Sequence, residues 1–270
     1  MNIKLSNGCI HVETAGSGIP VLIMHGGGID HLHMQDALEP VFEKTTGWKR
    51  IYIDLPGHGL SNADDTVKSQ DDVLNMISEF LDVMFHGERI ALIGESRGSY
   101  HAMGLAHIRP DDFLGMMLIV AGGMSEDTTK HLPKHQTLVL VPEEISHNAS
   151  EEAIVRFQRL VVQKPEILEK IERTKVPAAK LVDKALAKRV GERFTFGFDL
   201  SNPTKRFEQP CLLLNGRQDS MAGYNDMLDA LELYPHATLA ILDRAGHSLS
   251  WEQPELFEAL TIEWLERMRD

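Results

Sequence analysis

One short stretch near the middle of the chain constrains the fold more than any other. Ile90 to Ile93 form an apolar run rich in β-branched residues, which predicts a buried strand, and Ser99 to His107 suits a helix. Residues 94–98 between them read Gly-Glu-Ser-Arg-Gly, a G-x-S-x-G pattern centred on Ser96. Glycines permit a sharp strand-to-helix turn that lifts the serine hydroxyl above the sheet, beside free N–H groups at the helix start. Chance alone can produce such a pattern, so its meaning depends on partners elsewhere in the chain.

The remaining sequence alternates apolar strands with helices. Helices are expected after a cap at Ser69 and over 35–42 and 254–268. The other strands are expected over 3–5, 9–14, 20–24, 50–53, 113–120, 210–214 and 238–242. Strands that are apolar throughout and separated by helices indicate an α/β fold with a mostly parallel sheet, covered by helices on both faces.

The alternation breaks between residues 122 and 206. This segment contains no convincing central strand, and it carries three helical patterns, over 151–163, 166–173 and 177–189. We interpret it as a helical cap inserted over the ends of the strands. The predicted domain division is therefore a core of residues 1–121 and 207–270 and a cap of residues 122–206.

The charge of the inserted segment also differs from that of the rest. Residues 151–206 contain 13 Lys plus Arg against 8 Asp plus Glu, a net charge of +5. Because the whole chain has a net charge of −13, the remaining residues together carry −18. One interpretation is solvated helix faces that also attract an acidic body. The other is a cationic roof that helps to hold an anionic substrate.

Composition excludes several classes of function. A net charge of −13 argues against binding nucleic acid or an anionic membrane surface, since both require clustered Lys and Arg. The sequence has no run as long as a membrane span, and the first residues lack a signal-peptide core. Cys9 and Cys211 are the only cysteines, too few for a disulfide framework. We therefore expect a cytoplasmic protein, and the oligomeric state stays open between monomer and homodimer.

Two residues at strand ends complete a candidate catalytic set with Ser96. A serine is a poor nucleophile at neutral pH unless an imidazole takes its proton and a carboxylate orients that imidazole. Asp219 and His247 each come shortly after an apolar strand. Because the carboxyl ends of parallel strands open onto one edge of a sheet, all three residues are expected to meet there.

The motifs together resemble the α/β-hydrolase superfamily. The matching segments, in order, are His-Gly-Gly-Gly at 25–28, Asp-x-Pro-Gly-x-Gly-x-Ser at 54–61, the Ser96 turn, Gly-Arg-x-Asp at 216–219 and Ala-Gly-His at 245–247. The resemblance covers nearly the whole chain apart from the insertion, where this superfamily commonly places its cap. It implies Ser96 as nucleophile, His247 as base and Asp219 as the orienting acid. Asp243 is a rival acid, but Asp219 follows its strand at the family position.

The resemblance also implies an oxyanion hole formed by the backbone N–H groups of Gly27 and Arg97. Gly27 lets a backbone approach closely, and Arg97 stands at the start of a helix. Gly26 and Gly28 are expected to shape the loop, and Gly28 is also a candidate substrate-binding residue. The alternative for these glycines is an ordinary turn.

Arg97 departs from the family pattern, which commonly has an uncharged residue after the nucleophile. A guanidinium near a sheltered site needs a carboxylate. One interpretation is an ion pair with Glu95 that stabilises the turn. The other is that Arg97 binds a carboxylate of the substrate.

The other histidines are interpreted as structural. In the family, the position of His25 is structural rather than that of a base, and His58 and Asp54 belong to turn chemistry. The pair His31-x-His33 resembles metal-ligand spacing, but no matching Cys, His or carboxylate cluster is evident nearby, so a surface or pocket-wall role is preferred. No metal or organic cofactor is expected.

The sequence thus predicts a cytoplasmic serine hydrolase of a small acyl compound, most simply a carboxylic ester. Two alternatives use the same triad: a carbon–carbon bond hydrolase of dienoic keto-acids, and an aminopeptidase. The aminopeptidase is disfavoured because residues 29–30, Ile-Asp, lack the proline of family prolyl aminopeptidases. A ligand-binding sensor or regulator that retains the triad is the alternative from another class.

Overall fold

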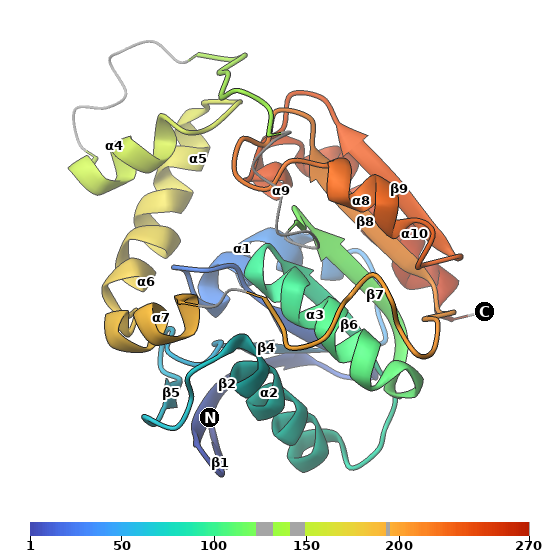
Figure 1. Ribbon diagram of the computed structural model, residues 1–270. Coiled ribbons are helices and arrows are strands. Elements are labelled where there is room, and N and C mark those ends of the chain that lie inside the picture. Colours follow the sequence, from blue (N-terminus) through green and yellow to red (C-terminus); the bar gives the residue numbers. More distant parts are fainter. Residues whose placement is uncertain (123–131, 141–148, 193–194, 270) are drawn as a thin grey trace.

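A twisted nine-stranded sheet forms the centre of the protein in a computed structural model that describes residues 1–122, 132–140, 149–192 and 195–269 (Figure 1). The strand order is β1-β2-β4-β3-β6-β7-β8-β9, and β5 pairs with β2. Strands from β4 onward along this order are parallel, whereas β1 and β2 are antiparallel to their neighbours. The predicted α/β fold with a mostly parallel sheet is confirmed. The strands are β1 (Asn2–Leu5), β2 (Gly8–Gly16), β3 (Ile19–Met24), β4 (Trp48–Ile53), β5 (Asn62–Ala63), β6 (Ile90–Glu95), β7 (Phe113–Ile119), β8 (Cys211–Gly216) and β9 (Ala237–Leu242).

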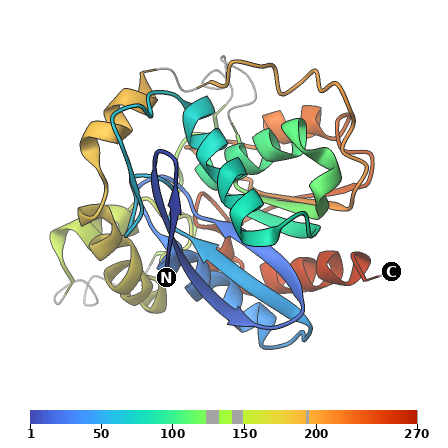
Figure 2. The ribbon, with the colours of Figure 1, turned by 90° about the horizontal axis from the view of Figure 1, so that it is seen from below.

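Helices cover both faces of this sheet, as Figure 2 shows. Helices α2 (Gln70–Phe85), α3 (Arg97–Ile108) and α8 (Asn225–Ala230) pack on one face, and α1 (His31–Phe42), α9 (Leu249–Glu252) and α10 (Pro254–Arg267) pack on the other. Burial on both faces of the sheet explains why the run from Ile90 to Ile93 in β6 is apolar. Leu92 belongs to the core on the α2 side, and Ile93, the next residue, belongs to the core on the α1 side.

Helix starts follow local capping chemistry. Ser69 caps the start of α2 as predicted, and together with Asp72 it forms a capping box. Helix α1 begins at His31 rather than at the predicted residue 35, because the Asp30 carboxylate accepts a hydrogen bond from the N–H of Leu32 and caps an additional turn.

The segment between β7 and β8 holds four helices in its described part: α4 (Glu151–Phe157), α5 (Pro165–Lys170), α6 (Val176–Lys180) and α7 (Lys184–Gly191). They lie to one side of the sheet, drawn in yellow to orange in Figure 1. A π-helical turn over Ile171–Lys175 joins α5 to α6. The division into core and cap stays a prediction, and residues 123–131, 141–148 and 193–194 of the predicted cap lie outside the described residues.

Two of the predicted helices in this segment have different limits. The helix predicted over 151–163 ends at Phe157, and Val162 instead forms a β-bridge with Val139. The single helix predicted over 177–189 is wrong. Asp183 interrupts it by accepting hydrogen bonds from the N–H groups that open α7, a capping role that propensity alone does not reveal.

Candidate active site

Ser96 stands at a sharp turn between β6 and α3. Its backbone has φ 51° and ψ −110°, a conformation that non-glycine residues rarely adopt. The flanking glycines make the turn possible, because a Cβ on Gly94 would lie 2.4 Å from the carbonyl carbon of Gly98, and a Cβ on Gly98 would lie 2.2 Å from the carbonyl oxygen of Met24. Ser99 braces the turn by donating its hydroxyl to the carbonyl of Gly94 at 2.6 Å. The hydroxyl of Ser96 is thereby held at the carboxyl edge of the sheet.

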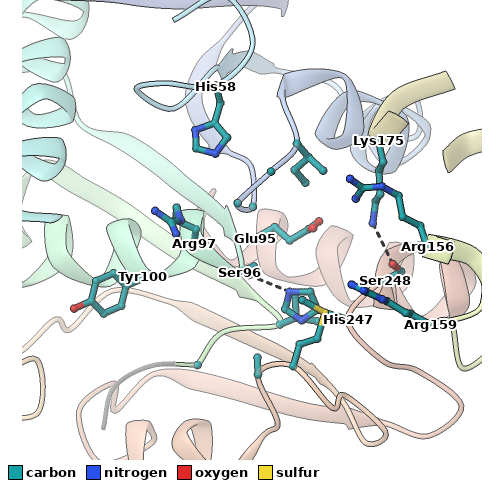
Figure 3. Close-up of a pocket in the computed structure, with 18 of the residues that line it drawn as sticks. His58, Glu95, Ser96, Arg97, Tyr100, Arg156, Arg159, Lys175, His247 and Ser248 are labelled. Atoms are coloured by element: carbon teal, nitrogen blue, oxygen red, sulfur yellow. Dashed lines mark hydrogen bonds between the residues drawn. The ribbon is translucent and has the colours of Figure 1, made fainter. Parts of the chain in front are cut away.

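The structure brings the three predicted triad residues together, and Figure 3 shows two of them, Ser96 and His247. The Nε2 atom of His247 lies 3.0 Å from the Oγ of Ser96, and its Nδ1 atom lies 2.8 Å from an oxygen of Asp219. The other Asp219 oxygen accepts the N–H groups of Met221 and Ala222. These bonds fix the carboxylate, which in turn fixes the imidazole with Nε2 directed at the serine.

Asp243, the rival acid, lies elsewhere. Its side chain is exposed and accepts a hydrogen bond from Gln218 at 2.7 Å. Asp219 is fully buried at the end of β8, where it contacts His247.

The electrostatics around His247 suit a general base. Burial opposes the charged imidazolium, but the charge and hydrogen bond of Asp219 outweigh burial and raise the pKa of His247 above its ordinary value. A stronger base accepts the serine proton more readily during attack.

The glycine-rich loop after β3 passes close to the serine. A Cβ on Gly26 would lie 3.3 Å from the Cβ of Ser96, and Gly27 and Gly28 line the same cavity as Ser96. Arg97 is the first residue of α3, a position whose backbone N–H has no partner within its helix. We propose that the N–H groups of Gly27 and Arg97 form the oxyanion hole.

His25 supports the loop and is unsuited to act as a base. Its Nε2 atom accepts the N–H of Leu55 at 2.9 Å, and its Nδ1 atom lies 2.6 Å from the carbonyl of Gly26. Burial, the largest cause, and the neighbouring His58 lower the pKa of His25 to about 3. Asp54 accepts the N–H groups of His31 and Leu60, as expected of a turn residue.

The ion pair between Arg97 and Glu95 considered from the sequence does not form. The Glu95 carboxylate instead bonds to Nε2 of His33 at 2.7 Å, and both side chains are buried. Figure 3 shows Arg97 and Glu95 pointing to different sides of Ser96. Burial favours the neutral carboxyl, but the charge and hydrogen bond of His33, helped by Lys175, lower the pKa of Glu95. Arg97 lines the cavity, and its side chain packs against Gly27.

A cavity of about 630 Å³ opens over Ser96. Its walls include the glycine loop and His247, together with residues of the inserted segment that helical periodicity had not identified. Among the latter are three cationic side chains, Arg156, Arg159 and Lys175. The only signal for them in the sequence was the positive charge of the segment as a whole.

Glu252 is a second feature that the sequence did not reveal. Its buried carboxylate accepts the N–H groups of Val161 at 2.6 Å and Val162 at 3.3 Å from the inserted segment, and that of Gly246 at 2.5 Å beside His247. One side chain thus joins the insertion to the loop that carries the candidate base.

His31 and His33 do not act as a pair, since His33 bonds to Glu95. The ring of His31 instead meets His11 from β2 and Asp54, with candidate ligand atoms all within 4.8 Å of one another. The expectation that no His or carboxylate cluster lies near His31 is therefore wrong. The antiparallel pairing of β2 with β4 brings His11 close to Asp54 and His31. In this structure His31 Nδ1 lies 2.8 Å from Asp54, at hydrogen-bond distance.

Comparison with known proteins agrees with the fold and the motifs. A model of the alpha/beta hydrolase family matches residues 21–260, so the chain belongs to the α/β-hydrolase family, as the motifs predicted. One relative is the 2-hydroxy-6-oxononadienedioate/2-hydroxy-6-oxononatrienedioate hydrolase of a Pseudomonas species, 26% identical over 97% of this chain and 93% of the relative. Another is the pimeloyl-(acyl-carrier protein) methyl ester esterase of Shewanella sp. strain MR-7, 24% identical over 97% of this chain and 96% of the relative.

Solved structures resemble the fold over nearly its full length. An alpha/beta superfamily hydrolase from Oenococcus oeni PSU-1 has a TM-score of 0.87 at 24% identity and covers 97% of both chains. A meta-cleavage product hydrolase from Pseudomonas fluorescens IP01 has a TM-score of 0.71 at 18% identity and covers 98% of this chain and 97% of that one. At these identities the likeness concerns the fold.

Proposed function

We propose that this α/β hydrolase is a serine esterase that cleaves a small acyl substrate, most simply a carboxylic ester. The observation that carries the proposal is the continuous set of contacts from Ser96 through His247 to Asp219, at 3.0 Å and 2.8 Å, beneath a cavity large enough for a small molecule.

The proposed reaction proceeds through an acyl-enzyme. Ser96 Oγ attacks the carbonyl carbon while Nε2 of His247 takes its proton, and Asp219 stabilises the imidazolium that forms. The negative oxygen of the tetrahedral intermediate accepts hydrogen bonds from the N–H groups of Gly27 and Arg97, each donor contributing about 3–4 kcal/mol. His247 then protonates the departing alkoxide. Water attacks the acyl-enzyme with the same base, which releases the acid and restores the serine.

A carbon–carbon bond hydrolase of dienoic keto-acids is the second candidate. It is supported by the activity for which the Pseudomonas relative is named, since that relative aligns with 97% of this chain. The same triad would serve, with a carbon leaving group in place of an alkoxide. The Shewanella relative, named as a methyl ester esterase, supports the first candidate.

We also propose a cytoplasmic location. Within the described residues, no helix combines the length and the apolar character that crossing a bilayer requires. Cys9 and Cys211 are both free thiols, which accords with a reducing compartment.

The test is turnover of two substrate panels by the wild-type protein and by Ser96→Ala. One panel holds p-nitrophenyl esters of short acids, and the other holds 2-hydroxy-6-oxo-dienoic acids. If the wild type cleaves the esters faster than the dienoic acids, and Ser96→Ala does not cleave them, the esterase is supported. If the wild type cleaves the dienoic acids faster than the esters, the second candidate is supported. A folded protein that turns over neither panel contradicts both and favours the ligand-binding alternative.

A further inference from the structure

We propose that the substrate carries a carboxylate remote from the scissile bond, and that Arg156, Arg159 and Lys175 bind it. This inference deepens the proposed function, because it specifies the substrate of the same cavity. It rests on the charge of the cavity wall and on the contacts that each of these cations makes.

The described cavity wall carries an excess of positive charge. Its charged residues are four cations, namely Arg97 and the three named above, and one carboxylate, that of Glu95. Glu95 already bonds to His33 at 2.7 Å. An anion that enters the cavity therefore meets a wall in which, among the described residues, cations outnumber carboxylates, in surroundings less polar than water where charge acts strongly.

The two arginines on the insertion retain unused donors. Arg156 reaches Glu152 through Nη2 at 3.1 Å, while its buried Nε atom has no acceptor among the described residues. Within the described residues, Arg159 makes no side-chain hydrogen bond or ion pair, although it lines the cavity. Guanidinium groups bind planar carboxylates through two parallel hydrogen bonds, which a neutral group cannot replace.

Lys175 lies deeper and closer to the candidate base. Its Nζ atom donates to the Oγ of Ser248, the residue after His247, at 3.1 Å, and it lies 4.6 Å from the ring centroid of Trp251. No described carboxylate lies within 4.0 Å of this ammonium group, so none of the described residues serves as its direct counter-ion. Burial lowers the pKa of Lys175, an energetic cost of its charge that a bound carboxylate would relieve. In Figure 3 Arg156, Arg159 and Lys175 gather on one side of His247.

Other cations of the insertion serve to attach it to the core. Lys170 and Arg173 both pair with Asp36 of α1, and Arg189 pairs with Asp65. Attraction between a basic insertion and an acidic body thus accounts for these residues. It does not account for Arg156, Arg159 and Lys175, which line the cavity that also contains Ser96.

The experiment compares two esters that differ by one methyl group: p-nitrophenyl hydrogen adipate, an anion, and methyl p-nitrophenyl adipate, which is neutral. The measured quantity is the ratio of kcat/KM for the anion to kcat/KM for the neutral ester, after subtraction of spontaneous hydrolysis. We expect a wild-type ratio of about 10 or more, the size of one charge-assisted hydrogen bond expressed as an affinity ratio. Arg159→Gln and Lys175→Met should each lower that ratio about fivefold or more.

Lys180→Met is the matched control, since it removes one positive charge from α6 at an exposed position outside the cavity wall. Its ratio should equal that of the wild type. A wild-type ratio of 1 or below overturns the proposal while leaving the esterase function intact. An equal fall in the ratio for Lys180→Met and Lys175→Met also overturns it, because the effect would then be a general field of the insertion.

A binding measurement keeps the proposal testable without turnover. In Ser96→Ala, monomethyl adipate should quench the fluorescence of Trp251, which contacts Lys175, at lower concentration than dimethyl adipate does. Equal binding of the two would contradict the proposal. Tighter binding of butyl phosphate than of monomethyl adipate would assign the site to phosphate and overturn the carboxylate. If the wild type hydrolyses neither ester but Ser96→Ala still binds the anion more tightly than the neutral compound, the proposed esterase function fails while this inference stands.

Discussion

The substitution Gly98→Ala tests whether close backbone packing holds the nucleophile in place. A Cβ on Gly98 would lie 2.2 Å from the carbonyl oxygen of Met24, 2.7 Å from its carbonyl carbon and 2.8 Å from the carbonyl oxygen of His25. Non-bonded atoms prefer separations of roughly 3.5 Å, so either α3 or the end of β3 must move by about 1 Å. Because all three contacts are backbone atoms, of the last residue of β3 and of the residue after it, no side chain can rotate away to relieve the clash.

The expected effect of Gly98→Ala is large on both stability and activity. Overpacking of this kind costs about 1–3 kcal/mol, which lowers Tm by roughly 3–10 °C in a chain of this size. A displacement of about 1 Å between nucleophile and base lowers kcat by roughly 100-fold. The assays are differential scanning calorimetry and ester turnover.

Gly191→Ala is the control, because a Cβ at Gly191, the last residue of α7, meets no atom within 4 Å and the backbone there is not left-handed. That variant should match or slightly exceed the wild type in Tm, since alanine favours helix more than glycine does. The reasoning is refuted if Gly98→Ala keeps both the Tm and the kcat of the wild type.

Three further predictions concern the residues around the base. Asp219→Asn should lower kcat by roughly 10⁴-fold through loss of the correct His247 tautomer, whereas Asp243→Asn should leave kcat unchanged; equal losses in the two variants would disprove the assignment of the acid. Because Asp219 raises the pKa of His247 and the base must be neutral, kcat/KM should rise with pH through a midpoint above about 6.5, and a midpoint at or below that value would contradict the shift. Glu252→Gln should lower Tm in a thermal melt, because the new NH2 group must face either the N–H of Gly246 or those of Val161 and Val162, a cost of about 1–3 kcal/mol; an unchanged melt would argue against a stabilising role for these hydrogen bonds.

Much of the fold and the positions of the triad could be predicted from the sequence. The strands are apolar throughout because a parallel sheet is buried on both faces, and Leu92 and Ile93 pack on opposite sides as that requires. Residues that follow parallel strands meet at one edge, so Asp219 and His247 could be placed beside Ser96 although 123 and 151 positions of sequence separate them from it.

Side-chain partners across the fold could not be predicted in this way. Glu95 was matched to Arg97 because the two are close in sequence, but the turn at Ser96 sends them to different sides, and Glu95 finds His33, 62 residues away. Glu252 reaches Val161 over 91 residues. Both contacts depend on how separate elements pack, which local patterns do not encode.

The position of Lys175 depends on a backbone feature that local sequence patterns also could not predict. Periodicity predicted a helix over 166–173 and another from 177, whereas the chain runs from α5 into α6 through a π-helical turn. This turn changes which residues face the cavity relative to a regular helix. The basic charge of the segment was visible in the sequence, but not which of its cations line the cavity.

The identity of the nucleophile is the central claim, and covalent labelling tests it most directly. The protein is treated with a fluorophosphonate, digested, and analysed by mass spectrometry, alongside His247→Ala and Ser96→Ala. We predict a single adduct on Ser96 in the wild type, much slower labelling in His247→Ala because the hydroxyl lacks its base, and none in Ser96→Ala. A folded wild-type protein that is not labelled at Ser96, or is labelled at the same rate without His247, would contradict the account.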